Sequence, residues 1–222
     1  MIRRIWAILR RLIVFALIAA IALVLLFRFV NPPTNLYILS ERARLGSVEQ
    51  RWVSIDEMSD WLPLSAAAAE DANFCLHSGF DLDGIQSALA DQERFRGAST
   101  ISQQVAKNVF LWPARSWFRK GLEAGFTVLI ELTWPKRRIM EVYLNIAEFG
   151  EGTFGVEAAA RRYFDTGAAE MTPRASGRLM AVLPDPKNRS PVSGTGYIQS
   201  RGRAIQHGAE TLRVDGRGAC FL

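Results

Sequence analysis

The feature that most constrains this chain is a run of apolar residues near its N-terminus. Residues 13–30 read IVFALIAAIALVLLFRFV, which is about the 20 apolar residues needed to cross about 30 Å of hydrocarbon. Arg28 lies close enough to the end of the run for its side chain to reach the membrane interface. We therefore predict a transmembrane helix over residues 13–30, preceded by a basic segment, 1–12, and followed by one domain, 31–222.

The charges beside this run predict its orientation. No acidic residue precedes it, whereas four arginines do: Arg3, Arg4, Arg10 and Arg11. The positive-inside rule then keeps the N-terminus in the cytoplasm and places the domain on the other side of the membrane. A cleaved signal peptide is the alternative. The run is long for a signal peptide and no small-x-small cleavage site follows it, so we expect an uncleaved anchor.

Composition narrows the classes of function. The chain has 222 residues, enough for the anchor and one compact domain. Its net charge of +5 suits an anionic partner such as phospholipid, a phosphorylated substrate or nucleic acid. Nucleic-acid binding is not expected, because the aromatic residues fall mostly on apolar faces instead of among exposed cations.

The two cysteines and two histidines exclude a Cys/His zinc site and a disulfide-scaffolded fold. For Cys75 and Cys220 the favoured interpretation is two separate thiols, with Cys75 buried as a small hydrophobe. A disulfide that ties the C-terminal tail to the domain is the alternative.

Helical spacing dominates the chain after residue 61, so we predict a mainly α domain with many short helices. A short β pair over LYIL (36–39) and RWVSI (51–55) is a weaker expectation, and a Gly- and Arg-rich tail closes the chain. One helix is expected to end at Glu70, and a second, capped by Asp81 or Asp83, is expected over 82–96. Further helices are expected over 101–110, 117–132, 136–149, 156–164 and from Pro173 to the segment LPDP.

The segment EDANFCLHSGFD, residues 70–81, places acid at the end of an alanine-rich helix. A carboxylate there faces the negative end of the helix dipole, which costs several tenths of a kcal/mol, about 0.3–1. Glu70 beside apolar residues can acquire the raised pKa that a general base requires. Alternatively, Glu70 and Asp71 cap backbone groups or pair with arginines, and His77 is a structural histidine.

The segment GASTISQQVAKN, residues 97–108, combines a helix start with polar side chains. Ser99 and Thr100 are expected to leave free amides there, a natural site for an oxyanion. Gln103, Gln104 and Lys107 project from the following turns. The alternative is an ordinary polar surface.

A third group of charges surrounds Glu123. Arg119 and Glu123 are four residues apart and can form an exposed ion pair. Together with Lys107, however, Arg115, Arg119 and Lys120 make four cations near two glutamates, Glu70 and Glu123. This arrangement fits a polyphosphate leaving group, because positive charge must meet the charge that develops on the phosphate.

These segments, taken in order, resemble the five motifs of glycosyltransferase family fifty-one, which polymerises peptidoglycan glycan strands. The resemblance covers about residues 31–191, with a motif-bearing core at about 62–191. Departures from the family pattern are Ala175, Ser176 and Gly177, where alanine-rich sequence is usual, and Asp185, where asparagine is common. The matching segments are EDANFCLHSGFD, GASTISQQVAKN, RKGLE, the stretch RRIMEVYLNIAEFGEGTFGVEAAARRYF, and LMAVLPDPKNRSP.

The resemblance implies a lysozyme-like, mainly α fold and lipid II as substrate. It implies that Glu70 is the base, that Asp71 and His77 shape the first-motif turn, and that Glu123 orients cations or holds a divalent metal, Mg²⁺ or Mn²⁺. No cofactor is otherwise required. The residues implied to bind the diphosphate are Lys107, Arg115, Arg119 and Lys120, and those implied to bind sugar or phosphate are Ser99, Gln103 and Gln104.

The resemblance also implies a location and partners. The single span and the absence of a downstream transpeptidase domain resemble the monofunctional members from Gram-negative bacteria, anchored in the inner membrane with a periplasmic domain. Expected partners are lipid II, the nascent glycan, the membrane, and proteins of cell-wall synthesis or division. Two other functions stay open: a lysozyme-like hydrolase or lytic enzyme, which has no pyrophosphate to neutralise, and a non-catalytic cell-wall scaffold.

Overall fold

The computed structural model describes residues 2–82, 99–114 and 116–222. The expected helix over 82–96, with its cap at Asp81 or Asp83, falls almost wholly outside the described residues, and so does Arg115. The described elements, in chain order, are α1 (Ile2–Phe27), α2 (Leu36–Leu45), β1 (Glu49–Gln50), η1 (Ile55–Glu57), α3 (Trp61–Glu70), α5 (Ile101–Phe110), α6 (Trp117–Thr133), α7 (Lys136–Ile146), β2 (Glu148–Gly150), β3 (Thr153–Phe154), α8 (Val156–Phe164), η3 (Ala168–Glu170), α9 (Pro173–Met180) and α10 (Gly196–Val214).

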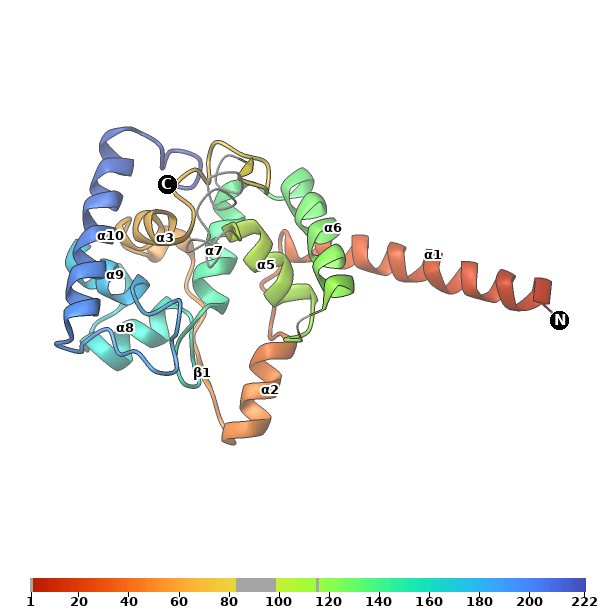
Figure 1. Cartoon of the computed structure of the whole chain (residues 1–222), viewed down its shortest axis with the longest axis horizontal. Coiled ribbons are helices and arrows are strands. Elements are labelled where there is room, and N and C mark those ends of the chain that lie inside the picture. Colours follow the sequence, from red (N-terminus) through yellow and green to blue (C-terminus); the bar gives the residue numbers. More distant parts are fainter. Residues whose placement is uncertain (1, 83–98, 115) are drawn as a thin grey trace.

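The apolar N-terminal helix projects away from a mainly helical domain, as Figure 1 shows. Residues Arg3–Phe27 of α1 are long and apolar enough to cross a membrane. The helix differs from the predicted 13–30 at both ends: the basic segment is its first three turns, and it stops at Phe27. The stop has a physical cause, because Pro32 and Pro33 cannot continue a helix and disfavour helical backbone before them.

The end of α1 is held by two residues of the domain. The Trp134 indole Nε1 donates to the Val24 carbonyl at 2.8 Å. The Arg138 guanidinium donates to the Phe27 carbonyl and the Val30 carbonyl, both at 3.0 Å. Carbonyls at a helix C-terminus lack partners within the helix, so these contacts fix the anchor to the domain.

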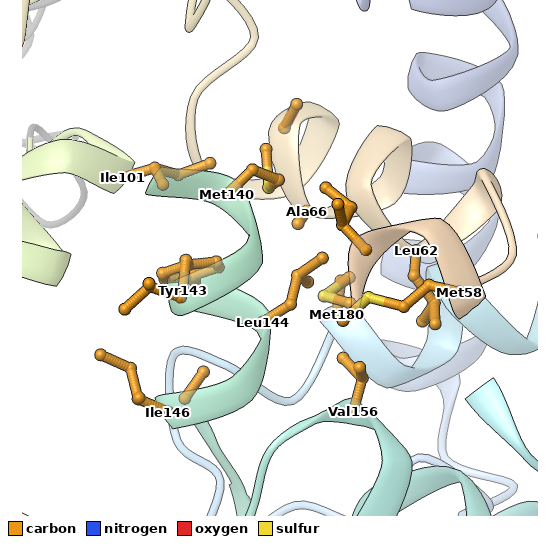
Figure 2. Close-up of a cluster of buried hydrophobic side chains, with 14 of the residues drawn as sticks. Met58, Leu62, Ala66, Ile101, Met140, Tyr143, Leu144, Ile146, Val156 and Met180 are labelled. Atoms are coloured by element: carbon orange, nitrogen blue, oxygen red, sulfur yellow. The ribbon is translucent and has the colours of Figure 1, made fainter. Parts of the chain in front are cut away.

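Helix α7 is the centre of the core. Most of its side chains are buried on all sides, among them Ile139, Met140 and Leu144, as expected for a helix surrounded by other elements. In Figure 2, Tyr143 lies on the side of α7 near Ile101 of α5. Leu144 points the opposite way, toward Met180. Helix α7 therefore separates α5 and α6 from α3, α9 and α10.

The β structure is small and lies elsewhere than expected. The strand order is β1-β3-β2, with β1 parallel and β2 antiparallel to β3. The expected strand at 36–39 is wrong, because this segment forms the first turn of α2. Asn35 caps that turn by accepting a hydrogen bond from the Ile38 amide at 2.8 Å, and a local cap of this kind favours helix over strand.

Two further expectations are corrected at helix ends. The helix expected over 136–149 stops at Ile146, because Glu148 and Phe149 enter β2. The last predicted helix ends at Met180, before the segment LPDP. The sequence between them follows the prediction, with α8 over Val156–Phe164.

The Gly- and Arg-rich tail contains a long helix, α10, that the sequence analysis did not predict. Its buried residues recur every three or four positions: Ile198, Gly202, Ile205, Ala209 and Leu212. A Cβ on Gly177 of α9 would lie 2.5 Å from the Gly202 carbonyl oxygen. The glycine that departs from the alanine-rich family pattern at 177 therefore permits the close crossing of α9 and α10.

The cysteines form a disulfide, Cys75–Cys220, which joins residues 145 positions apart. The favoured interpretation of two thiols is thus wrong, and the alternative is confirmed. The Phe74 and Phe221 rings, next to the two cysteines, pack with their centroids 6.1 Å apart. The C-terminal tail is thereby attached to the segment that follows Glu70.

Candidate active site

Glu70 is the last residue of α3 and is partly buried. The alanine run before it packs into the core, with Ala66 and Ala67 essentially without exposure. The Gln104 side chain donates from Nε2 to Glu70 Oε2 at 2.9 Å. Burial raises the pKa of Glu70 and the charge of Asp71 raises it further, while the hydrogen bond from Gln104 lowers it. A carboxylate in this environment has the properties of a general base.

Asp71 connects the end of α3 to the start of α5. Its Oδ2 accepts the Ile101 amide at 3.0 Å, and its Oδ1 lies 2.9 Å from His77 Nε2. His77 Nδ1 accepts the Gly79 amide at 3.1 Å, so Nε2 carries the proton donated to Asp71. Asp71 and His77 thus hold the turn that sets Glu70 beside Gln104.

The same turn needs glycine at position 79. Gly79 has a φ of +92°, and a Cβ there would lie 2.7 Å from Thr127 Cγ2 and 2.9 Å from Glu131 Cγ. The Thr100 hydroxyl donates to the Gly79 carbonyl at 2.7 Å. Backbone of this conformation strains any residue with a side chain.

Lys136 holds the turn through contacts of its side chain. Its Nζ donates to the His77 carbonyl at 2.7 Å and to Glu131 Oε1 at 2.8 Å, and it lies 4.4 Å from the centre of the Phe74 ring. Lys136 and Glu131 do not belong to any group of candidate site residues predicted from the sequence. Their contact with the turn is a tertiary one that no local pattern indicates.

Helix α5 begins with a capping box. Thr100 Oγ1 accepts the Gln103 amide at 3.2 Å, and Gln103 Oε1 accepts the Thr100 amide at 3.0 Å. The Thr100 amide is therefore not free, contrary to the expectation of an oxyanion site there. Gln103 is buried in this cap, whereas Gln104, one position on, points to Glu70. Ser99 is partly buried and precedes the cap.

The expected cations gather around Glu123, which is only 2% exposed. Arg119 Nη1 lies 2.8 Å from Glu123 Oε2, and Lys120 Nζ lies 2.5 Å from Oε1. Both carboxylate oxygens are therefore ion-paired. The fourth expected cation, Arg115, lies outside the described residues.

Lys107, on the neighbouring helix α5, is partly buried, and its side chain has no hydrogen-bond or ion-pair partner in the described part of the chain. Burial lowers the pKa of Lys107, and the charge of Glu123 opposes this effect. The positive charges of Arg119 and Lys120 lower the pKa further. A partly buried ammonium that has no protein partner and lies among other cations suits an anionic ligand.

A cavity of about 350 Å³ opens beside these groups. Gln104, Lys107, Arg119 and Tyr143 line it together, so the cavity joins the partner of Glu70 to the cations. Other lining residues come from α2, the 111–114 loop, β2 and the segment after α9, and they include Tyr37, Trp112, Glu148 and Pro186.

Sequence reasoning missed some of these residues. Tyr37 donates a hydrogen bond of 2.5 Å to Glu148 Oε2, across 111 positions. Arg201 of α10 donates to the Ala69 carbonyl at 3.0 Å, and its charge lowers the pKa of Glu70. Neither contact has a local sequence signal. Tyr143 lies within the helix predicted over 136–149, where nothing in the sequence marks it as a cavity residue.

Comparison with known proteins agrees with this geometry. The family model described as Transglycosylase matches residues 39–209. The chain is 51% identical over 195 residues to a biosynthetic peptidoglycan transglycosylase of Jannaschia sp. (strain CCS1), covering 88% of this chain and 81% of that relative. It is 47% identical over 207 residues to a protein of the same name from Rhodospirillum centenum (strain ATCC 51521 / SW), covering 91% and 89%.

A mainly helical domain with these matches is an enzyme of the peptidoglycan glycosyltransferase class. The chain belongs to the Transglycosylase family, glycosyltransferase family fifty-one, and its matches over most of each relative's length are to monofunctional members. The lysozyme-like, mainly α fold expected from the motifs is confirmed.

Proposed function

We propose that this enzyme extends a glycan strand by transferring it from undecaprenyl pyrophosphate to the 4-hydroxyl of lipid II. The hydroxyl oxygen attacks the anomeric carbon of the donor and Glu70 accepts the proton. The bond from that carbon to the pyrophosphate breaks as the new β-1,4 bond forms, so the α-linked centre is inverted. Undecaprenyl pyrophosphate leaves with the electron pair.

The observation that carries this proposal is the position of Glu70 relative to the cavity. A base must reach the proton that it removes, and Glu70 is joined to the cavity wall by the hydrogen bond from Gln104. Because its pKa is raised, the Glu70 carboxylate binds a proton more strongly than an ordinary carboxylate does. The polar side-chain atoms of Asp71 and His77 are paired with each other and with backbone amides, so we assign both residues to shaping the turn.

The cations supply what the leaving group requires. Lys107 and Arg119 line the same cavity, where their charge can stabilise a departing diphosphate. Lys120 completes the group through its ion pair with Glu123, and we extend the assignment to Arg115 on the family motif alone. Gln104 and Ser99 stay proposed sugar or phosphate contacts, whereas we assign Gln103 to the helix cap.

Glu123 is proposed to orient these cations. Each of its two oxygens contacts a cation, Arg119 or Lys120, and a metal ion would have to compete with these ion pairs. Across residues 2–82, 99–114 and 116–222, no three His, Cys, Asp or Glu side chains gather as metal ligands. We therefore propose that the basic side chains, and not Mg²⁺ or Mn²⁺, stabilise the charge of the leaving group.

The membrane arrangement follows from α1 and its neighbour α6. Figure 1 shows α6 beside the base of α1, and α6 exposes Trp117, Phe118 and Leu132 to 92%, 72% and 77%. Exposed apolar groups of this size mark a surface that contacts apolar material. We propose an inner-membrane protein with residues 1–12 toward the cytoplasm and residues 31–222 in the periplasm, where the domain meets lipid II, the nascent strand and other cell-wall synthesis or division proteins.

The test is polymerisation of labelled lipid II by the detergent-solubilised protein, beside Glu70→Gln, with lysozyme digestion of the product. We expect a lysozyme-sensitive ladder from the parent and none from the variant. Recovery of intact lipid II from the parent would favour a scaffold, and shortening of a preformed glycan would favour a hydrolase. A ladder of equal intensity from Glu70→Gln would overturn the assignment of the base.

A further inference from the structure

Tyr143 combines a buried hydroxyl with a place on the cavity wall. The residue is 1% exposed, and its ring lies in the hydrophobic cluster of Figure 2. The hydroxyl oxygen is buried and has no hydrogen-bond partner among the residues that the structure describes. Tyr143 nevertheless lines the cavity that contains Gln104 and Lys107.

A phenylalanine would fill the same core position without this hydroxyl. Burying a hydroxyl that has no partner is unfavourable, and buried polar groups in native proteins are nearly always paired. A hydroxyl retained at such a position therefore points to a partner that arrives from the cavity.

The electrostatic setting of the hydroxyl indicates what it can do. Burial raises the pKa of Tyr143 well above its ordinary value, and the charges of Glu70 and Asp71 raise it further. The hydroxyl thus stays protonated throughout the working pH range and can donate a hydrogen bond. The negative charges of Glu70 and Asp71 therefore act on the Tyr143 hydroxyl.

Of the two carboxylates, only Glu70 has an oxygen to spare. Asp71 Oδ1 and Oδ2 are paired with His77 and the Ile101 amide. Glu70 Oε2 accepts from Gln104, and Oε1 has no hydrogen-bond partner within the described residues. The other charged groups acting on Glu70 are Arg201 on α10, Lys107 on α5 and the adjacent Asp71.

We propose that Tyr143 is a positioning residue for the catalytic base: its hydroxyl donates to Glu70 Oε1 through one bridging water and favours the ionised carboxylate. A water that joins two polar groups at a buried site is nearly as effective as a direct hydrogen bond. Donation to the charged form lowers the pKa of a carboxyl group. Tyr143 would thus offset part of the effect of burial on Glu70. The inference rests on the proposed role of Glu70.

The experiment is the pH dependence of kcat/KM for lipid II polymerisation by the full chain and by Tyr143→Phe. Without the donor, Glu70 protonates at higher pH, so we expect the acid limb to move up by roughly one pH unit and activity on that limb to fall about tenfold. Thermal unfolding of Tyr143→Phe should occur close to the parent temperature, because the ring and its packing are kept.

A matched control separates this role from a structural one. Tyr163→Phe removes a hydroxyl from α8, a helix that does not line the cavity, and should leave the acid limb in place. An acid limb of Tyr143→Phe that superimposes on the parent's would overturn the inference, whatever the change in unfolding temperature. Absence of polymer from the parent would instead refute the proposed function.

Discussion

Gln104 donates a 2.9 Å hydrogen bond to Glu70, and this contact joins two helices that are distant in the sequence. Asp71 makes it possible, because its carboxylate holds the first amide of α5, at Ile101. Asp71, which follows Glu70 directly, thus fixes the distance between the end of α3 and the second turn of α5. A change in either carboxylate should affect both the chemistry and the helix junction.

Glu70→Gln should abolish polymerisation and stabilise the fold. Loss of a general base lowers the rate by about 10²- to 10⁴-fold. Burial raises the pKa of Glu70, so its ionisation weakens the folded state as pH rises from the ordinary carboxyl pKa to the raised one. The variant lacks this loss, so its unfolding temperature at neutral pH should lie above the parent's, by about 2–4 °C for each 1 kcal/mol regained. Calorimetry at acidic and neutral pH checks this.

At a pH below both carboxyl pKa values, the stability difference between parent and Glu70→Gln should vanish. A variant that is less stable than the parent at neutral pH would contradict the burial of an ionised Glu70.

Lys107 should set the alkaline limit of activity. Burial lowers the pKa of Lys107, so its positive charge is lost at a lower pH than that of an ordinary lysine. Lys107→Arg keeps the charge, because the guanidinium does not deprotonate in proteins, and should move the alkaline decline of kcat/KM upward. Lys107→Met should lose about 10²- to 10³-fold at every pH. Coincident alkaline limbs in the parent and Lys107→Arg would show that another group titrates.

Gly79→Ala should destabilise the active-site turn. The residue has positive φ, and the added Cβ would meet Thr127 and Glu131 at less than 3 Å, so we expect a loss of at least about 1–3 kcal/mol in unfolding free energy. Gly121→Ala is the matched control in α6, where a Cβ meets no atom within 4 Å. A helical site of this kind should gain about 0.4–1 kcal/mol. Denaturant titration of both variants measures the difference, and equal effects would argue against strain at position 79.

The disulfide should contribute strongly to stability, because it closes a long loop. Cys75 and Cys220 are 145 positions apart, and loss of such a crosslink typically costs about 2–5 kcal/mol. The Cys75→Ser/Cys220→Ser double variant should therefore unfold at lower denaturant concentration than the oxidised parent, and close to the reduced parent. Two reactive thiols in the denatured, unreduced parent would contradict the bridge.

Local patterns in the sequence predicted the parts of the fold that depend on local interactions. The helices predicted over 101–110 and 156–164 have these bounds in the structure. Helix α2 was missed because Leu36 and Tyr37 suit a strand as well as a helix, and the Asn35 cap decides between them. Helix α10 was missed because glycine disfavours helix in isolation. In the folded chain Gly202 permits its contact with α9.

The candidate site divides in the same way. Glu70, Lys107 and Glu123 could be proposed from motif spacing. In the structure Lys107 lines the cavity, and Glu123 is ion-paired with Arg119, which also lines it. Spacing could not show that Gln103 turns into a cap while Gln104 turns to Glu70. Spacing also could not show that the hydroxyl of Tyr143 lies at the cavity while its ring packs in the core. These distinctions depend on tertiary contacts between helices.

The attachment of α1 to Trp134 and Arg138 has a mechanical consequence. A catalytic domain on a loose tether would sample many heights and tilts above the bilayer. Here the last turn of α1 is bonded to Trp134, which follows α6, and to Arg138 in the first turn of α7, the helix that also carries Tyr143 to the cavity wall. If α1 spans the membrane as proposed, these bonds fix the distance between the cavity and the membrane surface, and a lipid-linked substrate would reach the cavity at one constant depth.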